Sequence, residues 1–431
     1  MQKESLFPAK AKTIRRYGQP DAACMAGERA TTRFMAGTVT QIEHAPYNNS
    51  VRRMPNKGGG IMTSEERHEA RYRRRCEARQ RRREEKSRKL GSFEEVFSFE
   101  NLYKAGKKCC RGVGWKCSTQ RYLGDLITNT ARTHRELMDG TWKTKGFHEF
   151  DLMERGKLRH IRSVHISERV VQRCLCDEML VPVFSAAFIY DNAASLKDKG
   201  IDFAMDRMNT HLQRHFRKHG LTGGVLVYDF SDYFNSAPHE PIYRETKRRI
   251  TDARIRSIAN GLMEDFGSRG FGLGSQVSQI DALMLPNKLD HAIKEKLGVK
   301  GYGRYMDDGY LIHEDIDHLK HCLEVMRREC AELGIRFNEK KTAVIPIVQG
   351  TKFLKTKFKL TETGKVIRKM NRKGTRKMRE KLKKFRARMD AGTMTEEDIR
   401  TAYESWRGHM RRGDSWRAMR RMDKYYKSLY A

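Results

Sequence analysis

The sequence has no long apolar run and no recognisable secretion signal. Its longest apolar segment, residues 179–190, is interrupted by Pro182 and is too short to span a bilayer. At the N-terminus, no apolar segment is followed by a small-residue cleavage site. We therefore interpret residues 179–190 as core and expect a cytoplasmic protein without a membrane partner.

Cysteine is also scarce, at nine residues in 431, which is too few for a disulfide framework. Cys109, Cys110 and Cys117 lie close together in the sequence, but no C-x2-C pair or nearby His-x3-His completes a set of four zinc ligands. A reducing cytosol would keep these side chains as thiols. We interpret the cysteines as structural or incidental.

Acidic residues are strongly outnumbered. The chain has 54 Asp and Glu against 88 Lys and Arg, a formal net charge of +34. This excess indicates a polyanionic partner, for which nucleic acid is the natural candidate. A chain of 431 residues can hold two or three compact units that each bury a core, so a multi-lobed enzyme is physically possible.

The first two segments of the chain differ from the rest in composition. Residues 1–61 lack sustained periodicity and end near a Gly-rich run, which predicts a poorly ordered leader and makes Met62 a second candidate for the start of the protein. Residues 62–92 contain a predicted basic helix over residues 64–90, with Ser64 as its N-cap. A solvated helix and a docking surface for RNA or an accessory protein both remain open.

Two strand-like segments carry aspartates at their ends. Residues 224–230 form an apolar, β-branched strand that ends at Asp229, and residues 303–312 predict two short strands joined by a tight turn at Asp307 and Asp308. A solvated turn would explain Asp307 and Asp308 alone, but a third carboxylate on a separate apolar strand favours a metal site. Adjacent carboxylates between apolar strands destabilise the fold unless cations neutralise them.

Magnesium suits such a site because hard divalent ions take oxygen ligands and keep water and substrate phosphates in their remaining positions. In two-metal phosphoryl transfer, one ion activates the attacking 3′-hydroxyl and the other stabilises the leaving pyrophosphate. The residues therefore predict two Mg²⁺ ions, with Mn²⁺ as the alternative.

Seven motifs, in the same order along the chain, resemble those of bacterial reverse transcriptases. YMDD at 305–308 is similar to the YxDD box, and VYDFSDYF at 227–234 to the first palm motif. LGSQVSQ at 273–279 resembles the GxxxSP/SQ motif, LGIRFNEKKT at 333–342 resembles LGxxxNxxKT, and FLK at 353–355 stands where the family has its primer-grip FLG. Residues 159–173, with Glu168 in place of the usual Asp, and residues 192–200 resemble two fingers motifs.

The resemblance covers about residues 157–430 and implies an α+β, right-hand polymerase fold. Fingers with part of the palm would occupy residues 93–220, and a ferredoxin-like (split βαβ) palm with the catalytic site residues 221–349. The primer grip and a helical thumb would follow in residues 350–431. In the thumb, Trp406 and Trp416 are open to two interpretations, helix packing or contact with a template–primer duplex.

The resemblance also implies roles for single positions. Asp229, Asp307 and Asp308 would be the catalytic carboxylates and, with Phe230, would hold the metal ions. Residues expected to bind the nucleotide are Phe230, Ser231, Asp232, Tyr233, Phe234, Lys197, Lys199, Gln279 and Lys341. Residues expected to contact template or primer are Arg159, Arg162, Gly274, Ser278, Tyr305, Met306, Phe353 and Leu354.

Two of these roles compete with simpler interpretations. Phe234 falls where the family has an aromatic steric gate against the ribose 2′-hydroxyl, which implies a preference for dNTPs, but a core aromatic is the alternative. Lys341 would act near the leaving phosphate, but it is equally interpretable as a solvated charge in a basic loop.

Gln279 and the segment SWRGH at 405–409 resemble the reverse transcriptases of diversity-generating retroelements. Such an enzyme would copy a template-repeat RNA with errors at adenines, together with a basic accessory protein. Retron and defence-associated enzymes, each with a dedicated non-coding RNA, are the alternative. An RNA-binding protein without activity is a further hypothesis, and the three intact aspartates argue against it. The expected partners are thus an RNA template, a DNA or RNA primer and dNTPs.

Overall fold

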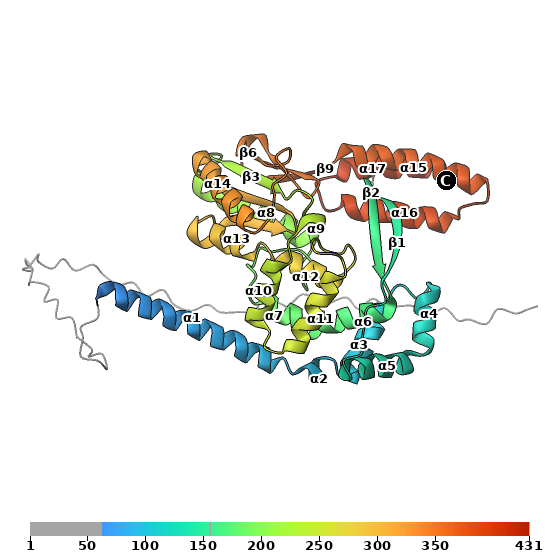
Figure 1. The fold of residues 1–431 in the computed structure, drawn as a ribbon. Helices are drawn as coiled ribbons and strands as arrows, with labels where there is room; N and C mark the ends of the chain where they lie inside the picture. The colour runs from blue at the N-terminus through green and yellow to red at the C-terminus, as the bar shows by residue number, and fades with distance from the viewer. Residues whose placement is uncertain (1–62, 155–156, 431) are drawn as a thin grey trace, which may run out of the picture. The chain divides into compact units, whose positions relative to one another are not determined.

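The computed structural model describes residues 63–154 and 157–430 (Figure 1). The predicted leader, residues 1–61, lies outside the described residues. The predicted basic helix is α1 (Ser64–Lys89), which agrees with the expected residues 64–90 to within one position. Within the described residues, no helix is both long and apolar enough to cross a membrane.

Short helices and one hairpin follow α1. The helices are α2 (Phe93–Val96), α3 (Phe99–Cys110), α4 (Cys117–Gly124), α5 (Leu126–Met138), α6 (Ile166–Leu175), the π-helix η1 (Cys176–Leu180), α7 (Val181–Ser185) and α8 (Ile201–His219). Strands β1 (Phe147–Glu154) and β2 (Lys157–Val164) pair antiparallel between α5 and α6. Five apolar side chains of residues 179–190 are buried, as expected: Met179, Leu180, Val183, Phe184 and Ile189. Ala186 and Tyr190 are exposed.

The central sheet has four antiparallel strands. These are β3 (Gly224–Asp229), β4 (Gly301–Tyr305), β5 (Asp308–His313) and β6 (Ala343–Pro346), in the spatial order β4-β5-β3-β6. Numbered by their sequence, and read from the β6 edge, the strands lie in the order 4-1-3-2, with helices between the first and second and between the third and fourth. This is the ferredoxin-like arrangement, so the predicted α+β class and palm topology are confirmed.

Helices cover both faces of this sheet (Figure 1). Side chains alternate between the faces along each strand. Leu226 and Leu311 pack in the core that includes α14 (Ile316–Glu332), whereas Val225 and Ile312 pack in the core that includes α8. The buried residues of α14 include Leu319, Met326 and Cys330, which belong to this core.

The insertion between β3 and β4 is helical. It contains α9 (Tyr233–Ser236), α10 (Glu240–Arg249), α11 (Ala253–Glu264), α12 (Gln276–Met284), α13 (Asn287–His291) and the π-helix η2 (Ala292–Lys296). Each of α11 and α12 begins at a residue whose side chain accepts hydrogen bonds from the first turn, Asp252 and Ser275 respectively. These caps fix where the two helices start.

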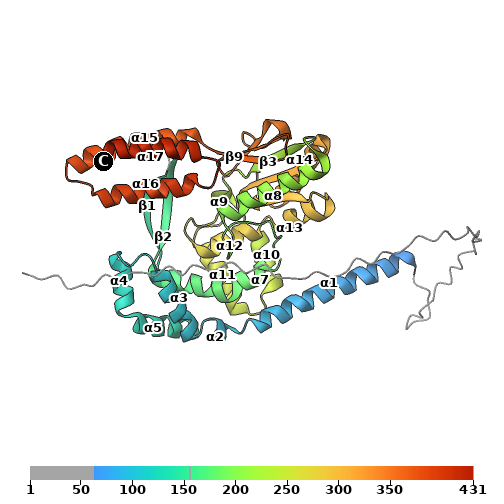
Figure 2. The same ribbon diagram turned by 180° about the vertical axis from the view of Figure 1, so that it is seen from behind.

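The C-terminal region begins with a small sheet. After the 3-10 helix η3 (Ile347–Gln349), three strands, β7 (Thr351–Phe353), β8 (Thr356–Leu360) and β9 (Val366–Met370), form the first part of the segment predicted to hold the primer grip and a helical thumb. Three helices follow: α15 (Arg372–Asp390), α16 (Glu396–Met410) and α17 (Trp416–Tyr430). Figure 2 shows these helices side by side. Trp406 packs in the core between these helices, as the packing interpretation expected. Trp416 is exposed, so packing does not account for it.

Candidate active site

The three predicted carboxylates meet at one end of the central sheet. Asp229, the last residue of β3, lies directly opposite Asp308 in the β3–β5 register. The backbone N–H of Phe230 donates to the carbonyl of Asp307 at 3.1 Å. Met306, in the turn between β4 and β5, has a φ of 54°, in the left-handed region that a side chain rarely adopts. The turn therefore holds both of its aspartates against the end of β3.

Asp229 is held by two side chains from the segment after α14. Lys341 Nζ lies 2.6 Å from Asp229 Oδ2, and Asn338 Nδ2 donates to Asp229 Oδ1 at 3.1 Å. The backbone N–H of Asn338 also donates to the carbonyl of Asp229 at 2.8 Å. The sequence predicted a position near the nucleotide for Lys341. The sequence analysis did not assign a role to Asn338, although the position of this residue in the LGIRFNEKKT motif could have indicated one.

The charges at this site are not balanced. Burial, followed by repulsion from Asp307 and Asp229, raises the pKa of Asp308 to about 7. Burial and repulsion from Asp229 also raise the pKa of Asp307. Burial lowers the pKa of Lys341, but its hydrogen bond to Asp229 and attraction to the carboxylates outweigh burial and raise it. Three carboxylates around one ammonium thus form a site that a further cation would stabilise.

The oxygen donors fit a hard divalent ion, but they do not form a closed cage. Among residues 63–154 and 157–430, no three Asp, Glu, His or Cys side chains are arranged so that they alone would hold a metal. The two observations agree because Mg²⁺ is usually bound through one or two carboxylates, with water and substrate phosphates as its other ligands. Asp229, Asp307 and Asp308 are the residues that would hold it.

A buried ion pair next to the turn at 305–308 was not predicted from the sequence. Arg304 binds both carboxylate oxygens of Asp290, with Nε at 2.8 Å and Nη2 at 2.6 Å, and both side chains are fully buried. Arg304 also donates to the carbonyl of Met306 at 3.0 Å and to that of Leu283 at 2.9 Å. Burial lowers the pKa of Arg304, but attraction to Asp290 outweighs it and raises the pKa. The guanidinium thus ties the turn to α12 and α13.

The predicted nucleotide-binding residues of the first palm motif divide into exposed and buried groups. Phe230 and Tyr233 are buried, and the Tyr233 hydroxyl donates to the carbonyl of Ala282 at 2.7 Å. Ser231 is half-buried, and Asp232 is exposed with a φ of 46°. Phe234 is half-buried and packs edge-to-face on Phe271, with 6.1 Å between ring centroids. The arrangement is compatible with either interpretation of Phe234.

The predicted fingers lysines differ in their contacts. Lys199 Nζ donates to the carbonyls of Tyr190 at 2.7 Å and Asn192 at 3.0 Å, so its ammonium is engaged within its own loop. Lys197 is exposed. Ser195, in the same loop, donates from Oγ to Gln279 Oε1 at 3.1 Å. The structure therefore brings Gln279 to the fingers loop and leaves Lys197 as the more accessible of the two ammonium groups.

Most of the predicted template and primer residues have partners inside the protein. Ser278 is fully buried, and its Oγ accepts from the N–H of Gly272 at 3.0 Å, whereas Gly274 is exposed. Arg162 donates to Glu149 at 2.9 Å and to the carbonyl of Phe266 at 3.1 Å. Arg159 lies on β2, but its side chain is outside the described part of the chain.

The remaining residues of this group lie in the turn at 305–308 and in the primer-grip position. Tyr305 and Met306 are half-buried beside the carboxylates. Phe353 is buried and packs on Tyr310, with 4.9 Å between centroids. Leu354 and Lys355 have φ values of 47° and 66°, in the region that glycine favours. Lys355, the departure from FLG, thus keeps a backbone conformation that suits glycine.

Comparisons with known proteins match part of the chain to a protein family. Residues 145–358 match the family model described as reverse transcriptase (RNA-dependent DNA polymerase). No curated protein matches the chain in sequence. Among solved structures, apo telomerase from Candida tropicalis truncated from its C-terminal domain is 13% identical, with a TM-score of 0.40 over 52% of this chain and 55% of that one.

Telomerase from Candida albicans in complex with a fragment of telomeric RNA is also similar, at 11% identity and a TM-score of 0.40. This similarity covers 55% of the chain and 50% of the telomerase, so the chain spans about half the length of these structures. The family match extends from the loop before β1 into β8 and includes all three aspartates. Residues 145–358 are therefore a reverse transcriptase domain.

Proposed function

We propose that the chain synthesises cDNA by extending a primer with dNTPs on an RNA template. The observation that carries this proposal is the pairing of Asp229 with Asp307 and Asp308 at one end of the central sheet. Reverse transcriptase domains generally use divalent metal ions, typically Mg²⁺. When bound, two such ions supply activation of the 3′-hydroxyl and stabilisation of the leaving pyrophosphate.

The protein's own residues would position the reactants. Asp229, Asp307 and Asp308 hold the ions, while Lys341 and Asn338 orient Asp229 and limit repulsion among the carboxylates. Lys197 is accessible to a triphosphate, and Gln279, held by Ser195, is a candidate contact for template and nucleotide. Phe230 would act through its position beside Asp307 rather than through its buried ring.

The functional lobes follow from this assignment. We propose that residues 93–220 form the fingers with part of the palm, residues 221–349 the catalytic palm, and residues 350–431 the primer grip and thumb. The basic surfaces of α15 and α17 suit a template–primer duplex, because phosphate contacts from Lys and Arg supply most of the non-specific affinity for nucleic acid.

Primer extension by the purified full chain tests the reaction. With Mg²⁺, dNTPs and a primed RNA, we expect extension by the wild type and none by the double variant Asp307→Ala, Asp308→Ala. Asp317→Ala with Glu324→Ala is the matched control, because it removes the same charge from exposed positions on α14. Primer extension by the Asp307→Ala, Asp308→Ala variant would contradict catalysis by these carboxylates.

Within reverse transcriptases, we propose a role in a diversity-generating retroelement, with a basic accessory protein and a template-repeat RNA as partners. Gln279 and the segment at 405–409 support it. Sequencing of the cDNA products tests it, and substitutions concentrated at template adenines are the expected result. Errors spread evenly over the four bases would instead favour a retron or defence-associated system with its own non-coding RNA.

A further inference from the structure

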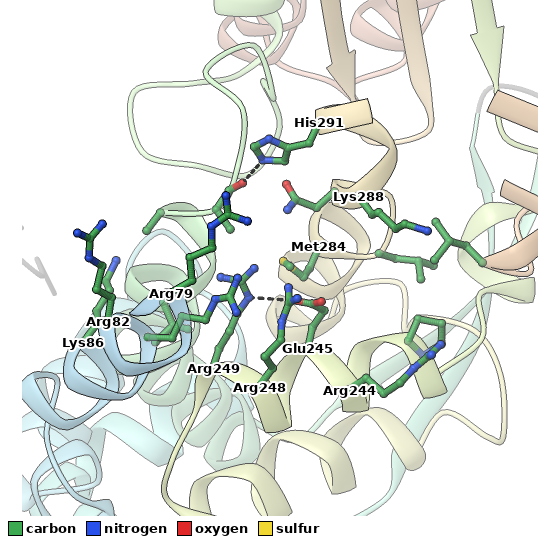
Figure 3. Close-up of a pocket in the computed structure, with 18 of the residues that line it drawn as sticks. Arg79, Arg82, Lys86, Arg244, Glu245, Arg248, Arg249, Met284, Lys288 and His291 are labelled. Atoms are coloured by element: carbon green, nitrogen blue, oxygen red, sulfur yellow. Dashed lines mark hydrogen bonds and ion pairs between the residues drawn. The ribbon is translucent and has the colours of Figure 1, made fainter. Parts of the chain in front are cut away.

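A basic cavity lies between α1 and α10, apart from the residues described above. It has a volume of about 1040 Å³ and is lined by eight Lys and Arg side chains and only three glutamates. Figure 3 shows Arg79 of α1 and Arg248 and Arg249 of α10 directed towards the same space. None of the residues assigned to the metal ions, the nucleotide or the primer lines it. The cavity is therefore separate from the residues assigned to catalysis, and its basic lining has to serve another purpose.

Four of the eight cations come from one face of α1. Arg79, Arg82, Arg83 and Lys86 follow the spacing i, i+3, i+4, i+7, which places them in one stripe along a helix. Within the described residues, none of the four forms an ion pair with a carboxylate.

Three other basic residues of the same helix, Arg73, Arg88 and Lys89, each pair with a glutamate four residues earlier. Further arginines of α1, such as Arg74 and Arg81, are exposed to solvent and do not line the cavity. The face that lines the cavity differs from the rest of the helix because its cations lie opposite those of another helix.

The stripe faces further arginines across the cavity. Arg248 and Arg249 on α10 share a single carboxylate, Glu245, at 2.6 Å and 2.9 Å. Burial, followed by repulsion from Arg248 and Arg249, lowers the pKa of Arg83, and burial with repulsion from Arg249 lowers that of Lys86. Like charges from two helices are therefore held close together without enough acid to balance them.

Hydrogen bonds prevent the two helices from separating to relieve this repulsion. Ser87, buried on α1, accepts through Oγ from the N–H of Thr251 at 3.0 Å. Gln80 donates to the carbonyl of Arg248 at 3.2 Å. The C-terminal half of α1 is therefore held against the rest of the chain at Gln80 and Ser87. An anion between the helices would remove the repulsion that this docking creates.

The other walls of the cavity narrow the choice of anion. Met284, Leu285 and Val183 supply apolar surface, and the buried carboxamide oxygen of Asn287 has no hydrogen-bond partner. Arginine binds phosphate oxygens through two parallel hydrogen bonds, and the apolar wall suits sugar or base surfaces. The unpartnered oxygen of Asn287 is a hydrogen-bond acceptor, and a ribose 2′-hydroxyl, which DNA lacks, would be a suitable donor for it.

We propose that this cavity binds the phosphodiester backbone of a folded RNA segment and so anchors the template-bearing RNA outside the polymerase site. The inference rests on the proposed function for the identity of the RNA, but not for the chemistry of the cavity. Its role is retention of the template RNA, since the residues that line it are not those that meet the nucleotide.

A charge-matched pair of variants of the full chain tests the proposal. Arg82→Gln with Arg83→Gln removes two cations from the cavity, and Arg74→Gln with Arg81→Gln removes two from exposed positions on α1 that do not line it. The probe is an unprimed RNA hairpin, and its affinity is measured by gel shift from 50 to 200 mM salt. We expect the cavity variant to bind about tenfold more weakly and to lose about 2 from its salt slope. The control variant should change less than twofold.

Three results would overturn the proposal. Equal losses in the two variants would mean that only overall charge matters. A DNA hairpin of the same sequence that bound as tightly as the RNA would exclude RNA as the specific occupant. Binding of a poly-glutamate peptide that depended on Arg82 and Arg83, with RNA binding unchanged, would assign the cavity to an acidic protein segment.

Primer extension on a short primed RNA separates this proposal from the proposed function. The cavity variant should extend that template as the wild type does. A wild type that bound the hairpin through Arg82 and Arg83 but extended no primer would count against the polymerase and in favour of the cavity.

Discussion

Asp290→Asn removes the carboxylate that neutralises the buried guanidinium of Arg304. The substitution keeps the size of the side chain and changes only its charge and hydrogen-bonding pattern. In the wild type, Asp290 accepts two hydrogen bonds from Arg304 and one from the Tyr302 hydroxyl, at 2.6 Å to 2.8 Å. After the change, Arg304 keeps the carbonyls of Met306 and Leu283 as neutral acceptors.

The magnitude follows from the burial of this pair. Breaking a buried ion pair by removing one partner costs about 3–5 kcal/mol, because the remaining charge is left without compensation. We expect a loss near the lower end, about 3 kcal/mol, since two carbonyls still accept from Arg304. A loss of this size lowers the midpoint of urea unfolding by about 1 M or less, because m in urea rises with protein size to about 3 kcal/mol/M or more.

Urea unfolding followed by circular dichroism, together with primer extension, is the assay. The control is Asp317→Asn, which breaks an exposed ion pair with Lys320, and it should leave both measurements unchanged. The double variant Arg304→Met, Asp290→Leu removes both charges, and we expect it to recover most of the stability. Its extension rate should stay low, because the carbonyl of Met306 no longer has its donor.

Two results would refute this reasoning. A stable Asp290→Asn protein would mean that the guanidinium does not depend on its carboxylate. A double variant that recovered extension as well as stability would show that Arg304 is not a positioning residue for the turn at 305–308.

Three further substitutions test other parts of the structure. Asn338→Ala should weaken the apparent affinity for Mg²⁺ by ~10–100-fold, because Asn338 orients Asp229, and a Mg²⁺ titration of primer extension measures it. Phe234→Ala should raise the use of rNTPs relative to dNTPs by ~10–100-fold in single-nucleotide incorporation, and an unchanged ratio would leave Phe234 as a core aromatic. Asp281, buried on α12, has a pKa raised by burial to about 8 from 3.8, so its contribution to stability is present below about pH 4 and is lost as the pH rises towards 8. Asp281→Asn should therefore be more stable than the wild type at pH 8, with the difference in urea midpoint shrinking towards pH 5.

The central sheet was predictable because its pattern is local. The apolar strand before Asp229 and the turn at Asp307 and Asp308 each lie within about ten residues. A pattern of that length can be recognised without knowledge of the tertiary contacts. The ferredoxin-like topology was instead implied by the resemblance of the ordered motifs to those of reverse transcriptases. The same resemblance placed the three aspartates in one site.

The supporting contacts were not predictable in this way. Arg304 and Asp290 lie on different elements, and nothing in their sequence neighbourhoods marks them as partners. The buried state of Ser278 and the internal contacts of Arg162 depend on where the loop at Gly272 and the turn at Phe266 lie in the folded chain. In the C-terminal region, β8 and β9 are rich in lysine and alternate between faces, so their apolar positions were too sparse to indicate strands.

The register of β3 against β5 has a consequence for folding. Asp229 and Asp308 belong to neighbouring strands, but the helices from α9 to α13 and strand β4 separate them along the chain. Closing such a long loop costs conformational entropy, and the strand contacts that offset this cost form only afterwards. Folds built from non-local pairings therefore form slowly. We therefore expect the carboxylates to come together late in folding, after the intervening helices have formed. A partly folded chain would then carry its basic surfaces before it carries a complete carboxylate site.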